Sequence, residues 1–202
     1  MTGAEAATAF AALFVVIDPI GLAPIFVALT AGMAPRARRA IALRACAIAA
    51  AILVVFALAG EAVLSFLGIS MPAFRIAGGI LLFLTALEML FEKRKPRREG
   101  QADAPPADPS VFPLALPLTA GPGAIATMIL LTDGASPLGA AQAIAVMLAV
   151  LAVVLALFLL AAPMERLLGP TGINVTTRLL GMLLAALSVQ FVLDGLSDVS
   201  AL

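Results

Sequence analysis

Six long apolar segments account for most of this 202-residue chain. A transmembrane helix needs about 20 apolar residues to cross roughly 30 Å of hydrocarbon. Segments of at least that length lie at 5–33, 40–67, 70–91, 111–133, 139–167 and 173–197. The chain is 63% hydrophobic and only 12% charged, which is more apolar surface than a water-soluble fold of this size can bury. The sequence therefore predicts an all-α, polytopic membrane protein with six transmembrane helices.

The basic residues fall almost entirely on one side of these spans. Four arginines lie between positions 36 and 44, and five lysines or arginines lie between positions 93 and 98. Arg166 and Arg178 belong to the same side, and the opposite side keeps only Arg75. Since positively charged loops stay in the cytoplasm, we expect these loops to be cytoplasmic and both termini to lie outside, on the periplasmic side.

One polar stretch divides the chain in two. It runs from Glu92 to Ser110 and is rich in proline and charged residues, as is typical of a linker. We therefore expect a first three-span repeat at 1–92, a cytoplasmic linker at 93–110 and a second three-span repeat at 111–202, which together form one membrane domain.

The two halves share an ordered set of helix breakers and charges. Pro19 and Pro24 recur 98 positions later as Pro117 and Pro122, and the glutamate and arginine near the later turns recur at offsets of 104 and 103. Each half has an odd number of spans, so the second half enters the bilayer upside down. Inverted repeats of this kind are typical of transporters, whose substrate site lies near the midplane between the halves.

The shared prolines predict that spans one and four are broken. Proline removes a backbone donor from a helix interior and clashes with the preceding turn, and the freed polar groups cannot face lipid. We expect Pro24 and Pro122 to begin two half-helices, whose N–H groups suit the carboxylate of a small substrate. The alternative is that both breaks are only kinks for packing. The candidate substrate-binding residues are Asp18, Pro19, Gly21, Ala23, Pro24, Pro117, Thr119, Ala120, Gly121, Pro122 and Gly123.

Ionisable residues inside spans are costly and need a partner or a task. Asp18 lies beside the first break, where it either caps a half-helix or carries a coupling proton or cation. Glu61 and Arg75 lie seven positions on either side of Gly68, so we expect an ion pair between neighbouring helices. Glu165 and Arg178 are expected to form the matching pair. Both pairs are interpreted as structural, and the alternative is that they gate a pathway.

Composition excludes several other classes of function. A single cysteine and no histidine leave no disulfide framework and no usual set of soft-metal ligands. No Gly-Lys-Ser/Thr motif for ATP is present, and the net charge of zero does not suit nucleic acid. We expect no cofactor, no metal and no enzymatic activity.

Three segments resemble signatures of the MarC family of bacterial membrane proteins. They are Phe14–Phe26 (FVVIDPIGLAPIF), Arg75–Phe83 (RIAGGILLF) and Pro117–Ile125 (PLTAGPGAI). The resemblance covers nearly the whole chain. It implies a bacterial or archaeal plasma membrane, a fold related to the LysE-type exporters and, as for some members, transport of small neutral amino acids such as glycine and alanine.

The leading hypothesis is a secondary transporter that exposes a midplane site alternately to the two sides. Its partners would be a small zwitterionic substrate, the lipid bilayer and a coupling proton or sodium ion, and the sequence does not specify an oligomeric state. The alternative is a structural or regulatory membrane subunit, or a passive channel without carrier activity.

Overall fold

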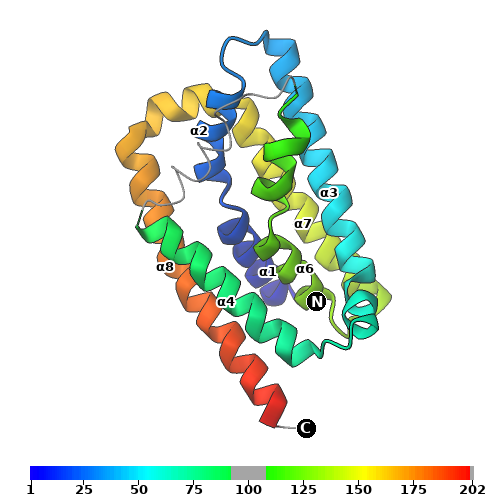
Figure 1. The fold of residues 1–202 in the computed structure, drawn as a ribbon. Coiled ribbons are helices and arrows are strands. Elements are labelled where there is room, and N and C mark those ends of the chain that lie inside the picture. Colours follow the sequence, from blue (N-terminus) through cyan, green and yellow to red (C-terminus); the bar gives the residue numbers. More distant parts are fainter. Residues whose placement is uncertain (92–107, 201–202) are drawn as a thin grey trace.

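The computed structural model of the chain describes residues 1–91 and 108–200, except for the side chains of 162–168, 170 and 200. Every element in these ranges is a helix, so the predicted all-α class is confirmed (Figure 1). The elements in chain order are α1 (Gly3–Ile17), α2 (Pro19–Leu29), α3 (Pro35–Phe66), α4 (Met71–Leu90), η1 (Ser110–Thr119), α6 (Pro122–Thr132), α7 (Pro137–Leu159) and α8 (Ala161–Ser200).

The predicted spans correspond closely to these helices. Five spans are long and apolar enough to cross a membrane: α1 with α2, α3, α4, α7, and the Thr171–Val199 part of α8. The bent pair η1 and α6 is a sixth if it crosses as one unit. The fifth span ends earlier than expected, at Leu159 rather than 167. The chain continues into α8, which is interrupted at Gly169 because this residue has a φ of 61°.

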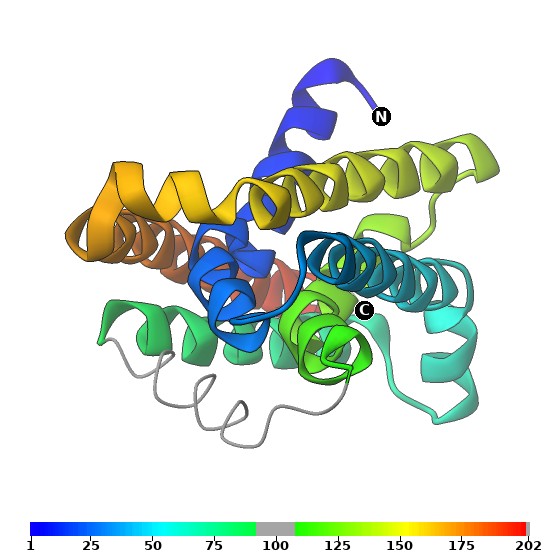
Figure 2. The ribbon, with the colours of Figure 1, turned by 90° about the horizontal axis from the view of Figure 1, so that it is seen from above.

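The broken first span is more deeply buried than α3, α4, α7 and α8. In its most apolar window 67% of the residues are buried, whereas the values for α3, α4, α7 and α8 lie between 22% and 39%. Figure 2 shows α2 enclosed by α3, α7 and α8. This placement follows from the break itself, since the polar backbone groups that a break frees must be covered by protein rather than by lipid.

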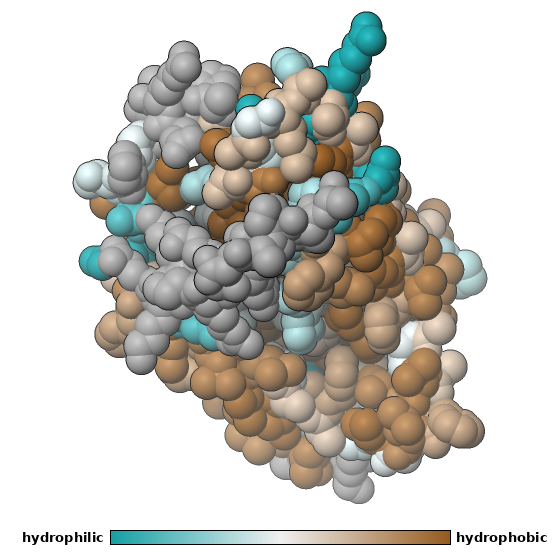
Figure 3. Space-filling view, turned by 45° about the horizontal axis from the view of Figure 1, so that its top comes forward, coloured by the Kyte–Doolittle hydropathy of each residue, from teal (hydrophilic) through white to brown (hydrophobic). Residues whose placement is uncertain are grey.

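The two ends of the bundle carry different turns and differ in polarity. Both chain termini lie toward one end, which we call the terminal end, together with the turn between α6 and α7 (Figure 1). The linker end carries the turn between α2 and α3 and the start of η1. In Figure 3 the flank of the bundle is largely hydrophobic, and hydrophilic side chains gather toward the linker end. Exposed apolar side chains such as Val55, Leu58 and Leu183 suit contact with lipid.

The most extensive helix contact is between α4 and α8, the third spans of the two predicted repeats. Glycines allow this close approach: Gly79 of α4 faces α8, while Gly181 and Gly195 of α8 face α4. Small residues at such interfaces let transmembrane helices pack tightly, because lipid gives no hydrophobic driving force for association. The contact is consistent with an inverted repeat, which stays a prediction.

Two adjacent glycines on α4 provide a test of this packing. A Cβ added to Gly79 would lie 2.8 Å from both the Ser188 carbonyl oxygen and Val192 Cγ2, whereas one added to Gly78 would meet Ala126 Cβ at 3.4 Å. We expect Gly79→Ala to destabilise the protein by about 1–3 kcal/mol through overpacking. Gly78→Ala should be neutral or stabilising by up to about 1 kcal/mol, since alanine is the better helix former.

Labelling of Cys46 can report the thermal unfolding of both variants. Cys46 is the one cysteine in the sequence and is 8% exposed, so a thiol-reactive dye should label it only as the protein unfolds. The melting temperature of Gly79→Ala should fall clearly below that of Gly78→Ala. Equal melting temperatures would contradict the α4–α8 packing.

Candidate functional site

The first break consists of a single residue, Asp18. Its backbone is left-handed (φ 54°, ψ 63°), and it both ends α1 and begins α2. Aspartate is one of the few residues that adopt this conformation readily, because its short polar side chain can bond locally. Asp18 Oδ1 accepts a hydrogen bond of 3.1 Å from the Gly21 backbone N–H, so the carboxylate caps α2. The side chain is fully buried.

The expectation that Pro24 begins the half-helix is wrong. The half-helix begins at Pro19, and Pro24 lies inside α2. The left-handed residue and its carboxylate cap are sufficient to restart the helix at once, with Pro19 at the first position, where a missing N–H costs nothing. The unwound segment is therefore shorter than the sequence suggested.

Gly21 is held close beneath the Asp18 carboxylate. A Cβ added to Gly21 would overlap the Asp18 side chain, and all three of its nearest atoms would belong to that carboxylate group. The cap and the glycine therefore depend on each other: the carboxylate reaches the Gly21 N–H only because position 21 has no side chain.

The second break is built differently. It follows η1, a π-helical segment with non-helical backbone angles at Phe112 and Leu116. The chain then bends by 57° before α6 begins. Pro122 is the first residue of α6, as predicted from the sequence. The Thr119 hydroxyl donates a 2.8 Å hydrogen bond to the Leu114 carbonyl oxygen, so its hydrogen is already bonded within η1.

No side chain among the described residues caps the N-terminus of α6. The N–H groups of Gly123 and Ala124 belong to the first turn, where a helix supplies no acceptor of its own. The two breaks thus differ electrostatically: the α2 N-terminus already binds the carboxylate of Asp18, whereas the α6 N-terminus is capped by no side chain that the structure describes. Uncapped N–H groups at a helix start favour an anion.

The fold brings the two breaks together. Val16, two residues before Asp18, lies beside Gly123, and a Cβ added there would be 3.2 Å from Val16 Cγ1. Helix α1 packs along α6, so the C-terminal end of α1 lies beside the N-terminal end of α6.

The predicted site residues differ in how far they are buried. The buried ones are Asp18, Pro19, Ala23, Thr119 and Ala120; the partly buried ones are Gly21, Pro24, Pro117, Gly121 and Gly123; and Pro122 is exposed.

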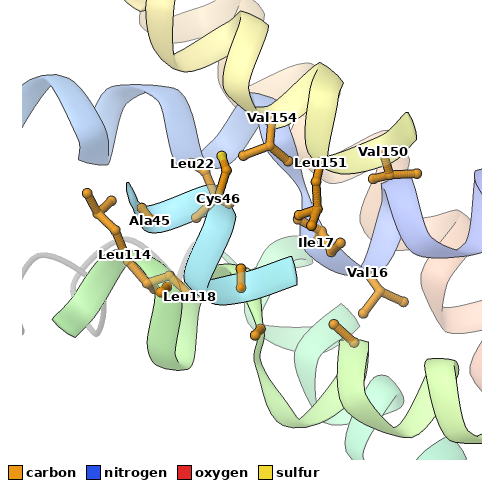
Figure 4. Close-up of a cluster of buried hydrophobic side chains, with 14 of the residues drawn as sticks. Val16, Ile17, Leu22, Ala45, Cys46, Leu114, Leu118, Val150, Leu151 and Val154 are labelled. Carbon is orange, nitrogen blue, oxygen red and sulfur yellow. The ribbon is translucent and has the colours of Figure 1, made fainter. Parts of the chain in front are cut away.

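Apolar side chains from three other elements pack around the first break. Figure 4 shows Val16, Ile17 and Leu22 facing side chains of α3, η1 and α7. The facing residues include Ala45, Cys46, Leu114, Leu118, Val150, Leu151 and Val154, all buried. The sequence did not single these residues out, because an apolar residue inside a span carries no positional signal. They pack the region of the breaks tightly, so a bound solute would require the half-helices to move apart.

The predicted partner of Arg75 is wrong. Arg75 Nη1 lies 2.6 Å from Asp198 Oδ2 and Nη2 lies 3.4 Å from Asp133 Oδ2, whereas Glu61 is exposed. Helix α4 packs against α8 and α6 rather than along α3, which carries Glu61. Asp133 ends α6, where a negative charge is unfavourable to the helix dipole and a nearby cation offsets it. We call these three residues the Arg75 cluster.

The other predicted pair stays a prediction. The side chain of Glu165 lies outside the described residues, and Arg178 is exposed on α8. Most of the predicted linker, 93–110, also lies outside them. At its described end, Asp108 forms an ion pair with Arg44 of α3, which connects the segment before η1 to the first half of the chain.

The Arg75 cluster predicts a contrast between two single substitutions. Arg75→Gln should destabilise the protein by about 1–3 kcal/mol, because two carboxylates would face each other without their shared cation. Glu61→Gln should change stability by less than about 0.5 kcal/mol, as is usual for an exposed position. Thermal unfolding monitored at Cys46 measures both. Greater damage from Glu61→Gln than from Arg75→Gln would contradict the role of the Arg75 cluster in stability.

Comparison with known proteins agrees with the membrane fold. The model of the MarC family, described as MarC family integral membrane protein, matches residues 4–200. A UPF0056 membrane protein of Archaeoglobus fulgidus is 39% identical over 195 residues, which cover 94% of this chain and 91% of the relative. The UPF0056 inner membrane protein YhgN of Escherichia coli (strain K12) is 37% identical over 199 residues, which cover 95% and 96%. No solved structure matches significantly. The chain belongs to the MarC family of integral membrane proteins.

Proposed function

We propose that this protein is a secondary transporter of small zwitterionic solutes, with neutral amino acids such as glycine and alanine as the best candidates. The observation that carries the proposal is the meeting of the two breaks, where Val16 lies beside Gly123. One break presents a buried carboxylate and the other presents uncapped helix N–H groups. A hydrogen-bond acceptor at one break and hydrogen-bond donors at the other suit a molecule that carries both an ammonium group and a carboxylate.

In this proposal the substrate carboxylate binds the N–H groups of Gly123 and Ala124 at the start of α6. Its ammonium group binds near Asp18 and the carbonyl groups at the end of α1. Small residues at the breaks, including Gly21, Ala120 and Gly121, leave room only for a short side chain. The packed cluster around the breaks is then an occluded form, which opens by separation of the half-helices toward either side.

Counterflow in proteoliposomes tests the proposal. Vesicles are loaded with unlabelled alanine, and labelled alanine is added outside. A carrier should accumulate label transiently above its equilibrium level, because only a carrier exchanges one molecule for another. A channel would equilibrate the label without an overshoot, and a structural subunit would transport none, so either result would refute the carrier.

Competition with alanine analogues tests the two charges separately. Propionate lacks the ammonium group and ethylamine lacks the carboxylate, while both resemble alanine in size. We expect glycine and alanine to compete for exchange, and propionate, ethylamine and the much larger phenylalanine to compete poorly. Inhibition by propionate equal to that by alanine would leave the proposed role of Asp18 without support.

The role of Asp18 in energy coupling is part of this proposal. Asparagine can retain the cap, since its amide oxygen can accept the Gly21 N–H, but it cannot carry a proton. If Asp18 couples transport to protons, Asp18→Asn should exchange alanine across an unenergised membrane but fail to concentrate it against a gradient. Full accumulation by Asp18→Asn would leave Asp18 as a helix cap alone.

We also propose a plasma-membrane location in a bacterium or archaeon, with both termini outside. Ala31 and Ala135 lie in exposed turns at the linker end and the terminal end, so they form a matched pair. In a Cys46→Ala background, Ala135→Cys should react with an impermeant thiol reagent on intact cells, whereas Ala31→Cys should react only after lysis. The reverse pattern would overturn the orientation that the basic residues predict.

A further inference from the structure

A pocket of about 170 Å³ opens at the linker end of the bundle, away from the two breaks. It lies between the end of α2, the turn that follows, the first turns of α3 and the end of α7. Its lining includes Phe26, Met33, Arg38, Arg39, Phe158 and Leu159. Neither the predicted substrate site nor the Arg75 cluster contributes to it.

The floor of the pocket is apolar and well ordered by packing. The rings of Phe26 and Phe158 stack with centroids 4.6 Å apart and planes inclined by 6°, and both side chains are 1% exposed. The Arg38 guanidinium lies over the Phe26 ring, 5.7 Å from its centroid. This cation–π contact keeps Arg38 at the edge of the floor.

The charge of the pocket is not neutralised by the described part of the protein. None of the described residues that line the pocket is acidic. Within residues 1–91 and 108–200, the arginines with a described ion pair are Arg44 and Arg75, and the pocket arginines have none. Two guanidinium groups beside an apolar surface therefore line the pocket without a carboxylate from residues 1–91 or 108–200.

This chemistry does not suit the proposed zwitterionic substrate. The lining of the pocket, as far as the structure describes it, offers no carboxylate, hydroxyl or side-chain amide to accept hydrogen bonds from an ammonium group. It suits an amphiphilic anion, because arginine binds phosphate oxygens in a planar, bidentate geometry and the floor favours hydrocarbon. The pocket lies where α2 and α7 end and α3 begins, which is the level of the lipid headgroups when these helices span a bilayer.

We propose that this pocket binds the headgroup of an anionic phospholipid. Arg38 and Arg39 pair with its phosphate, and the glycerol and the first part of an acyl chain lie against Met33 and Leu159, beside the stacked rings of Phe26 and Phe158. The pocket is too small for a whole lipid, and the exposed Leu159 and Leu160 offer a path for the chains along α7. Basic pockets between transmembrane helices on the cytoplasmic side are known to take such headgroups, and the linker end is the one expected to face the cytoplasm.

The experiment measures phospholipid binding to the purified full-length protein by native mass spectrometry. Phosphatidylglycerol is compared with phosphatidylcholine of the same chains. Phosphatidylglycerol should bind to the wild-type protein at least tenfold more tightly, and its binding should weaken with increasing ionic strength. Arg38→Gln and Arg39→Gln should each weaken it by about fivefold, as expected for one basic residue near an anionic lipid.

Arg36→Gln is the matched control, since Arg36 is an exposed arginine in the first turn of α3 that does not line the pocket. It should change binding by less than twofold. An equal loss in Arg36→Gln would mean diffuse attraction to the basic end, and equal binding of the two lipids would mean no headgroup site. If inorganic phosphate at millimolar concentration displaced phosphatidylglycerol fully, the pocket would be a site for free anions rather than for a lipid headgroup. Each of these three results would overturn the proposal, and none of them depends on transport activity.

Discussion

Gly21→Ala is expected to destabilise the protein by about 2–4 kcal/mol, the combined cost of overpacking and of a lost helix cap. The added methyl group would overlap the Asp18 carboxylate. That carboxylate would then leave its place above the Gly21 N–H, and the hydrogen bond that caps α2 would be lost. Thermal unfolding followed at Cys46 measures the loss, which should exceed the helix-propensity gain of about 1 kcal/mol that alanine brings.

A double-mutant cycle separates this mechanism from general crowding. Asp18→Gly removes the three atoms nearest to the new methyl group, and glycine adopts the φ of 54° without strain. Gly21→Ala should therefore cost little in an Asp18→Gly background, which gives a coupling energy of at least about 1.5 kcal/mol. Additive effects in the cycle would mean that the methyl group conflicts with other neighbours, and that the cap does not depend on Gly21.

Gly121→Ala is expected to abolish most exchange while the protein still folds. A Cβ on Gly121 would lie 2.6 Å from the Pro117 carbonyl oxygen, and neither group can rotate away because both belong to the backbone of the second break. Strain of about 1–3 kcal/mol that is present in only one of two conformations changes their ratio about 5- to 150-fold. Alanine counterflow per folded molecule should therefore fall by about tenfold or more.

Gly78→Ala is the control, because Gly78 lies on α4 and faces α6 but does not belong to the proposed substrate site. Its Cβ would meet Ala126 Cβ at 3.4 Å, which is an ordinary contact distance. At least half of the wild-type exchange rate should remain. Gel filtration checks that both variants are folded. Wild-type exchange by Gly121→Ala would remove the second break from the transport cycle.

Much of the architecture could be predicted from the sequence because lipid constrains it strongly. Long apolar segments separated by polar turns predict spans to within a few residues, except where Gly169 divides the helix after Leu160. Prolines beside glycines predicted both breaks, and Pro122 begins α6 as expected. These features are local: they depend on a lost backbone donor or on the cost of polar groups in hydrocarbon, and both can be read from neighbouring residues.

Contacts between distant helices were decided only by the tertiary structure. Glu61 and Arg75 are equally far from Gly68, so the sequence predicted that they lie at the same depth in the membrane. Depth alone does not determine which helices are neighbours. Glycines allow α4 to pack closely against α8. Arg75 therefore contacts Asp133 and Asp198, which lie 58 and 123 positions later in the sequence. The stack of Phe26 on Phe158 and the packing of Val16 beside Gly123 arise in the same way. Apolar residues inside spans are interchangeable in a hydropathy pattern, and their partners are determined by side-chain shape across the whole bundle.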